Sequence, residues 1–140
     1  MPQQPPILII QGDREEQLIL LDVIGKLNIK NPVKFIDDGV AAFEFLQNQF
    51  IQPLVILCDV NIPGMNGLEL RRKINAQEAL RRNSIPFLFL TSSANKQLVR
   101  EAYDLTVQGF FLKPKKTESL ENVLKVIIDY WKSSVHPNSF

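Results

Sequence analysis

Five short apolar runs divide the chain, and longer stretches with helical spacing lie between them. The runs cover residues 7–10, 33–36, 54–58, 87–91 and 109–112. They are rich in β-branched and aromatic residues, as strands are, whereas the stretches between them repeat apolar residues every three or four positions. Strands that alternate with helices predict one α/β layer structure, with a parallel sheet of five strands and five helices.

The polarity of the runs indicates the place of each strand in the sheet. Residues 54–58 and 87–91 lack polar alternation, which predicts central strands covered on both faces. Residues 33–36 include a lysine and are predicted to form an edge strand. The basic residues at 71–73 and 81–82 are predicted to form the solvated face of a single helix.

Length and composition limit the class of protein. The 140 residues fit one domain, which we expect over residues 7–134, with loose termini at 1–6 and 135–140. A net charge of +1 gives no reason to expect nucleic acid or an acidic membrane as a partner. The single cysteine, Cys58, excludes an internal disulfide. With no signal peptide and no membrane span in the sequence, we expect a cytoplasmic protein.

Polar residues with complementary chemistry follow four of the predicted strands. Residues 11–13 (Gln-Gly-Asp) follow the first strand, Asp59 follows the third, Thr91 ends the fourth and Lys113 follows the fifth. Each has a purely structural explanation as a turn, cap or surface residue. Together they are predicted to converge, because the carboxyl ends of parallel strands meet at one edge. A carboxylate can attack phosphorus, a hydroxyl can donate to a phosphoryl oxygen, and an ammonium can neutralise it.

A longer pattern contains these residues. It combines Asp-x-x-x-Pro-Gly-x-x-Gly at 59–67 with Thr91–Ser92, Lys113–Pro114 and the stretch DDGVAAFEFL at 37–46. The pattern resembles the receiver domain of two-component response regulators over residues 7–131. This resemblance implies a doubly wound, flavodoxin-like sheet in the strand order 2-1-3-4-5, with helices on both faces. It also implies that the Lys113–Pro114 peptide bond is cis.

The resemblance assigns a role to each residue. Asp59 would accept a phosphoryl group from a histidine kinase or a phosphotransfer protein, Thr91 would bind that group and Lys113 would pair with it. Asp59 and the main-chain carbonyl of Asn61 would hold Mg²⁺. Phe110 lies at the position of an aromatic switch that follows the movement of Thr91. Because phenylalanine lacks a hydroxyl, the switch would work by packing alone.

The resemblance also concerns the output of the protein. No output domain follows the fifth predicted helix, so we expect a single-domain response regulator that signals by docking to another protein. We expect no catalysis beyond its own phosphorylation and dephosphorylation. The family generally uses the face of the fourth helix, fifth strand and fifth helix, and a homodimer is open. Residues on or near that face are Tyr103, Phe110, Lys113, Lys115 and Lys116.

The match fails at the end of the first strand. The family places two adjacent acids there to hold Mg²⁺, whereas this chain has Gln11 and Gly12. Glycine supplies no ligand, and an amide oxygen carries no full charge, so we expect weakened Mg²⁺ binding with Gln11 acting through water. Asp13 becomes a ligand only if Gly12 permits a kink that turns it inward. With fewer acids present, Asp59 and Lys113 are expected to form an ion pair without phosphorylation.

Three alternatives follow from the same residues. The first is a pseudo-receiver, a phosphorylation-independent interaction module, favoured by the Gln11–Gly12 substitution. The second is a phosphatase of the haloacid dehalogenase type, which needs a second acid where this chain has Asn61. The third is a flavin mononucleotide site, which needs a hydroxyl-rich loop where this chain has the acidic sequence QGDREEQ.

Overall fold

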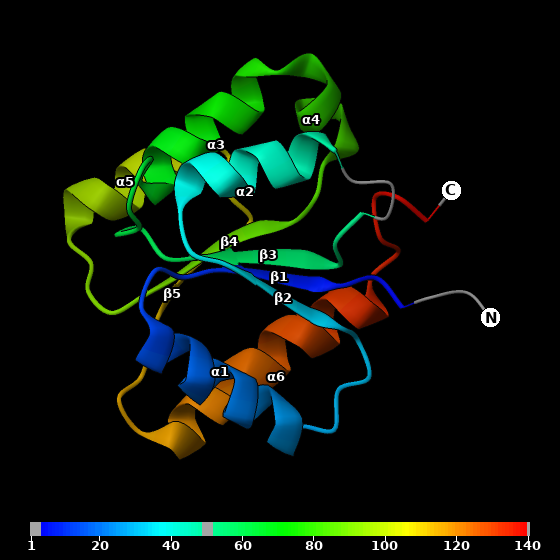
Figure 1. Cartoon of the computed structure of the whole chain (residues 1–140), viewed down its shortest axis with the longest axis vertical. Helices are drawn as coiled ribbons and strands as arrows, with labels where there is room; N and C mark the ends of the chain where they lie inside the picture. The colour runs from blue at the N-terminus through cyan, green and yellow to red at the C-terminus, as the bar shows by residue number, and fades with distance from the viewer. Residues whose placement is uncertain (1–3, 49–51, 140) are drawn as a thin grey trace.

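Five parallel strands form one sheet in the order β2-β1-β3-β4-β5 (Figure 1), as the resemblance implies. The computed structural model describes residues 4–48 and 52–139. The strands are β1 (Ile7–Ile10), β2 (Val33–Ile36), β3 (Val55–Cys58), β4 (Phe87–Thr91) and β5 (Gly109–Leu112). The helices are α1 (Arg14–Lys26), α2 (Gly39–Gln47), α3 (Gly67–Ala76), α4 (Glu78–Asn83), α5 (Lys96–Asp104) and α6 (Thr117–Ser133).

The helices cover both faces of the sheet. Helices α1 and α6 lie on one face, and α2, α3, α4 and α5 lie on the other (Figure 1). Each face has its own apolar core. Successive strand residues point to opposite faces of the sheet, so each core takes every second residue of a strand. Every residue of β3 and β4 is buried, as predicted for central strands. Strand β2 lies at the edge, and its Lys34 is exposed.

The prediction that residues 71–73 and 81–82 lie on one helix is wrong, because the chain breaks at Gln77. This residue has an extended backbone (φ −97°, ψ 113°) and separates α3 from α4. Both Ile74 and Leu80 are buried in the core. On a continuous helix they would point about 120° apart, so only a break lets both side chains face the sheet. Arg71, which was predicted to be solvated, is 8% exposed.

The described parts of both termini are hydrogen-bonded to the domain. The carbonyl of Pro6 accepts from the Leu54 backbone N–H at 2.8 Å. A ring nitrogen of His136 lies 2.9 Å from the carbonyl oxygen of the same Leu54. These contacts satisfy backbone groups at the entrance to β3.

Candidate functional site

The sheet register brings the predicted site residues together. Ile10 pairs with Cys58 at the end of β1 and β3, so Gln11 and Asp59 leave the sheet side by side. Thr91 pairs with Leu112 at the end of β4 and β5, so Lys113 follows at the same edge. Helix α1 starts directly after β1 and adds its first turn to this edge. The four residues therefore meet where the carboxyl ends of the strands meet.

One carboxylate oxygen of Asp59 accepts two hydrogen bonds from the adjacent loop and from β4. The backbone N–H of Asn61 donates to Oδ1 at 2.9 Å, and the hydroxyl of Thr91 donates to the same oxygen at 3.1 Å. Thr91 is 1% exposed, whereas the Asp59 side chain is 12% exposed. The hydroxyl is thus fixed in the protein interior, while the carboxylate reaches the surface.

The other carboxylate oxygen of Asp59 faces Gln11 and Lys113. The side-chain amide Nε2 of Gln11 donates to Oδ2 at 3.0 Å, and Nζ of Lys113 lies 3.7 Å away. The backbone N–H of Asp13 donates to Oε1 of Gln11 at 3.1 Å. This bond fixes the amide orientation, because the opposite orientation would place an oxygen against the carboxylate. Gln11 is therefore a hydrogen-bond donor to Asp59 in this structure.

Glu16, in the first turn of α1, joins the site without having been predicted. Its Oε2 accepts from Nζ of Lys113 at 3.0 Å, closer than the 3.7 Å between that nitrogen and Asp59. The Lys113 side chain is 5% exposed, so its charge is compensated by two carboxylates rather than by water. The expected Asp59–Lys113 pair is present, but Glu16 is the nearer partner. The sequence signal was an acid in the first turn of the helix that follows β1.

Asp13 caps helix α1 and does not turn towards Asp59. Its Oδ1 accepts from the backbone N–H groups of Glu15 at 2.8 Å and Glu16 at 3.3 Å. This is the usual role of an aspartate at a helix N-cap, and it orients the carboxylate towards the helix. The kink at Gly12 that would have turned Asp13 inward is therefore absent.

Gly12 lies where a side chain has no room. A Cβ at this position would lie 2.8 Å from Cδ of Pro63 and 3.2 Å from the carbonyl oxygen of Asp37. An acid at position 12 would therefore require the loop after β3 to shift. The close packing of Pro63 therefore agrees with a glycine, rather than an acid, at position 12.

In this arrangement the expected ligands offer few free oxygen atoms to a Mg²⁺ ion. Mg²⁺ requires an octahedron of oxygen ligands. Asp59 already accepts from N–H and O–H donors at both oxygens, and Gln11 presents nitrogen. Within residues 4–48 and 52–139, no group of three or more His, Cys, Asp or Glu side chains could hold a metal ion. Among the expected ligands, the carbonyl oxygen of Asn61 is the only main-chain atom.

The residues around the site are packed and largely apolar. The half-buried ring of Phe110 lies 5.8 Å from that of Phe89, measured between centroids, and packs against the core. Burial, and secondarily the charge of Asp59, raises the pKa of the Cys58 thiol well above its ordinary value.

No peptide bond in the described part of the chain is cis, so the expectation of a cis Lys113–Pro114 bond is wrong.

The fold and this edge of the sheet define a receiver domain. Residues 7–125 match the model of the response regulator receiver domain, and the chain belongs to that family. Response regulator Rcp1 of Synechocystis sp. is 29% identical over 94% of this chain and 92% of its own length. Chemotaxis protein CheY-3 of Vibrio cholerae is 28% identical over 88% of this chain and 91% of its own.

Solved structures agree with this assignment. The phosphorylated cyanobacterial phytochrome response regulator RcpA superposes with a TM-score of 0.86 at 23% identity, over 96% of this chain and 99% of its own, which shows the shared fold. The Mn²⁺-bound form of Rcp1 gives a TM-score of 0.80 at 28% identity, over 94% and 96% of the two chains. Every helix in the described residues is too short or too polar to cross a bilayer.

Proposed function

We propose that this protein is a response regulator that accepts a phosphoryl group on Asp59. The observation that carries the proposal is the convergence of Thr91 and Lys113 on the two oxygens of one partly exposed carboxylate. In the transfer, an Asp59 oxygen forms a bond to phosphorus while the bond between phosphorus and the donor oxygen or nitrogen breaks. The donor leaves with the electron pair of that bond.

The neighbouring side chains are suited to the charge that the phosphoryl group brings. Lys113 supplies a buried ammonium, and Thr91 and Gln11 supply O–H and N–H donors on opposite sides of the carboxylate. Such preorganised donors stabilise charge that develops on phosphoryl oxygens. When the group arrives, Lys113 exchanges its contact with Glu16 for one with a phosphoryl oxygen. We propose that Mg²⁺ binds weakly here, and that Phe110 follows Thr91 by repacking against Phe89.

The partners follow from the family. The phosphodonor would be a histidine kinase or a phosphotransfer protein, and neither nucleic acid nor a membrane is required. The output would be a protein target docked on α5, β5 and α6, which correspond to the predicted fourth helix, fifth strand and fifth helix. Tyr103 of α5 and Leu112 of β5 are 50% and 56% exposed there. The same face would serve a homodimer, and we propose no catalysis beyond turnover of the phosphoryl group on Asp59.

Labelling with radioactive acetyl phosphate tests the proposal. Wild type is expected to incorporate one acid-stable, base-labile phosphoryl group, and Asp59→Asn is expected to incorporate none. Asp22→Asn is the matched control, because Asp22 is an exposed residue of α1 that pairs only with Lys26 among the described residues. Labelling of Asp59→Asn at the wild-type level would refute the assignment.

Failure of wild type to label, with or without Mg²⁺, would favour the pseudo-receiver instead. The comparisons give that alternative no support. The Gln11–Asp59 hydrogen bond is the one contact in its favour, because it satisfies the carboxylate without a phosphoryl group. A histidine phosphotransfer protein labelled on its histidine would repeat the test with the class of donor expected in the cell.

A further inference from the structure

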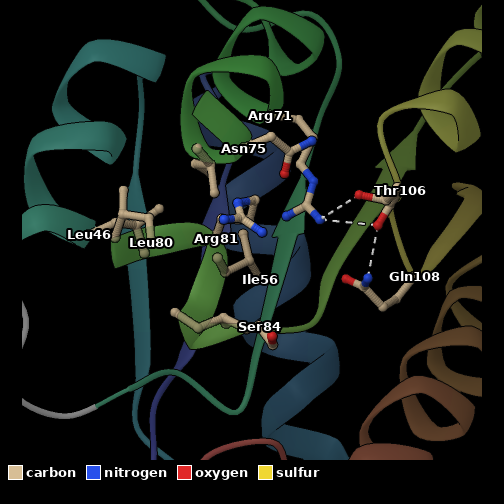
Figure 2. A pocket seen from close by; sticks show the side chains of 11 residues that line it. Leu46, Ile56, Arg71, Asn75, Leu80, Arg81, Ser84, Thr106 and Gln108 are labelled. Atoms are coloured by element: carbon tan, nitrogen blue, oxygen red, sulfur yellow. Dashed lines mark hydrogen bonds between the residues drawn. The ribbon is translucent and has the colours of Figure 1, made fainter. Parts of the chain in front are cut away.

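A cavity of about 370 Å³ lies at the amino ends of the strands, whereas Asp59 lies at their carboxyl ends. It is bounded by α3, α4 and the loops that lead into β4 and β5, at the amino ends of these strands (Figure 2). Its lining includes two arginines, Arg71 and Arg81, and no aspartate or glutamate. The receiver chemistry proposed above uses none of these residues.

Arg71 is a buried cation without a carboxylate partner. It is 8% exposed, and no aspartate or glutamate of the described residues forms an ion pair with it. Its Nε donates to the Leu105 carbonyl at 3.1 Å, and one terminal nitrogen donates to the Thr106 carbonyl at 3.0 Å. These bonds leave the second terminal nitrogen without an acceptor in the described part of the chain. Burial lowers the pKa of the guanidinium, because its charged form is desolvated.

Arg81 places a second positive charge beside the same cavity. Its neighbour Arg82 lies 3.8 Å from Glu78, whereas Arg81 forms no ion pair with the described residues. Figure 2 shows the Arg81 side chain reaching between Asn75 and Ile56, with Arg71 beside it. Two cations that share a cavity without an acid create an attractive potential for an anion.

The break at Gln77 is what brings the two arginines together. On one continuous helix, residues ten positions apart would be separated by about 15 Å along the axis and by about 80° around it. The extended backbone of Gln77 instead turns α4 across the end of α3, so both arginines line one cavity.

The rest of the lining is apolar on one side and polar on the other. Leu46, Ile56 and Leu80 are buried and form an apolar wall. Ser84 and Thr106 line the other side, where α4 and α5 end, and their positive φ angles of 51° and 63° are typical of such helix ends.

We propose that this cavity binds a small organic carboxylate, whose head group pairs with Arg81 and the free edge of Arg71 and whose apolar body lies against Leu46, Ile56 and Leu80. A bidentate arginine–carboxylate pair is strong because it is charge-assisted and geometrically matched. The binding is independent of phosphorylation at Asp59, which lies at the other edge of the sheet.

Titration with hexanoate, followed by ¹⁵N amide shifts and calorimetry, tests the proposal. Hexanoate is expected to shift the amides of Ser84, Thr106 and Gln108, and to bind at least about tenfold more tightly than 1-hexanol, which lacks the charge. Arg81→Gln is expected to weaken hexanoate binding about tenfold, while Arg82→Gln, on the same helix but outside the cavity, leaves it unchanged. Arg71 is left intact because its buried bonds hold the loop before β5.

Three results would overturn the proposal. Equal affinity for hexanoate and 1-hexanol would remove the role of the charge. An equal loss of hexanoate affinity in Arg81→Gln and Arg82→Gln would show a general electrostatic effect of positive charge on α4. Inorganic phosphate binding as tightly as hexanoate would remove the role of the apolar wall. Asp59→Asn is expected to bind hexanoate like wild type, which keeps this test separate from that of the phosphoacceptor.

Discussion

The side-chain amide of Gln11 donates to Oδ2 of Asp59 at 3.0 Å, on the oxygen that also faces the ammonium of Lys113. A neutral donor thus occupies the side of the carboxylate on which an acidic pair would hold a cation. The amide satisfies the carboxylate oxygen but supplies no ligand to a metal. Substitutions at the site therefore have different effects here than in a metal-dependent arrangement.

Gln11→Glu is expected to strengthen binding of a divalent cation. The substitution replaces an N–H donor with a second carboxylate beside Asp59, so Mn²⁺ affinity should rise about tenfold or more. Electron paramagnetic resonance of free Mn²⁺ during titration measures this change. Gln47→Glu, at the exposed end of α2, adds the same charge elsewhere and should leave the affinity unchanged. Equal affinities in wild type and both variants would contradict the role given to Gln11.

Lys113→Ala is expected to destabilise the fold and to alter the resting site. It leaves Glu16 and Asp59 as neighbouring carboxylates without their cation, so the free energy of unfolding should fall by about 1–3 kcal/mol. Urea denaturation measures the change. Lys125→Ala is the control, because Lys125 and Asp129 form an exposed pair that contributes less than about 1 kcal/mol. Equal stability of the two variants would argue against a structural role for the ion pairs of Lys113.

Thr91→Val is expected to reduce labelling by acetyl phosphate about tenfold or more, because a buried methyl group replaces the hydroxyl that donates to Asp59. Thr91→Ser keeps the donor and should stay within a few fold of wild type. Initial labelling rates measured at equal degrees of folding distinguish the hydroxyl from general damage to β4. Similar rates for the valine and serine variants would show that the hydroxyl plays no part.

Two glycines are expected to respond oppositely to alanine. Gly64 has φ +79°, and a Cβ added there would have its nearest neighbours at 3.5 Å, so Gly64→Ala should destabilise by about 1–2 kcal/mol through backbone strain alone. Gly25 lies within α1, and a Cβ there meets nothing within 4 Å, so Gly25→Ala should stabilise by about 0.5–1 kcal/mol. Thermal unfolding measures both changes. A change of the same sign at both positions would contradict the conformations described.

The Cys58 thiol is expected to make stability depend on pH. Its pKa is raised in the folded state by burial and by Asp59, so the unfolded chain loses this proton at a lower pH than the folded one. The resulting contribution to stability is complete below the unfolded pKa of about 8.5 and is lost as the pH rises above it. Cys58→Ala should lack this loss in urea denaturation between neutral and alkaline pH. A parallel pH dependence in both proteins would contradict burial of the thiol.

The alternation of strands with helices and the polarity of the strands could be predicted from local patterns, whereas the strand order 2-1-3-4-5 was implied only by the resemblance to receiver domains. The apolar runs at β3 and β4 are buried, and the lysine in β2 marks an edge. The convergence of Asp59, Thr91 and Lys113 then follows from parallel topology. The roles of these residues stay predictions until phosphoryl transfer is measured.

The remaining features depend on side-chain geometry that spacing does not reveal. Gln11 offers either an oxygen or an N–H group, and only the Asp13 backbone N–H decides which one faces Asp59. Glu16 had to be distinguished from other acids in the first turn of α1. The break at Gln77 carries no glycine or proline, and it arises because Ile74 and Leu80 must both reach the core.

The strand order has a consequence for how the chain acquires this site during synthesis. Gln11, Glu16 and Asp59 belong to the portion that contains β1, β2 and β3, three strands that are neighbours in the sheet. Thr91 and Lys113 emerge only with β4 and β5, which add successively to one side of β3. A nascent chain that has not yet received these last two strands carries the carboxylates without their hydroxyl and ammonium. The site is therefore complete only when the last strand is in place, because that strand brings the ammonium of Lys113 to the carboxylates of Glu16 and Asp59.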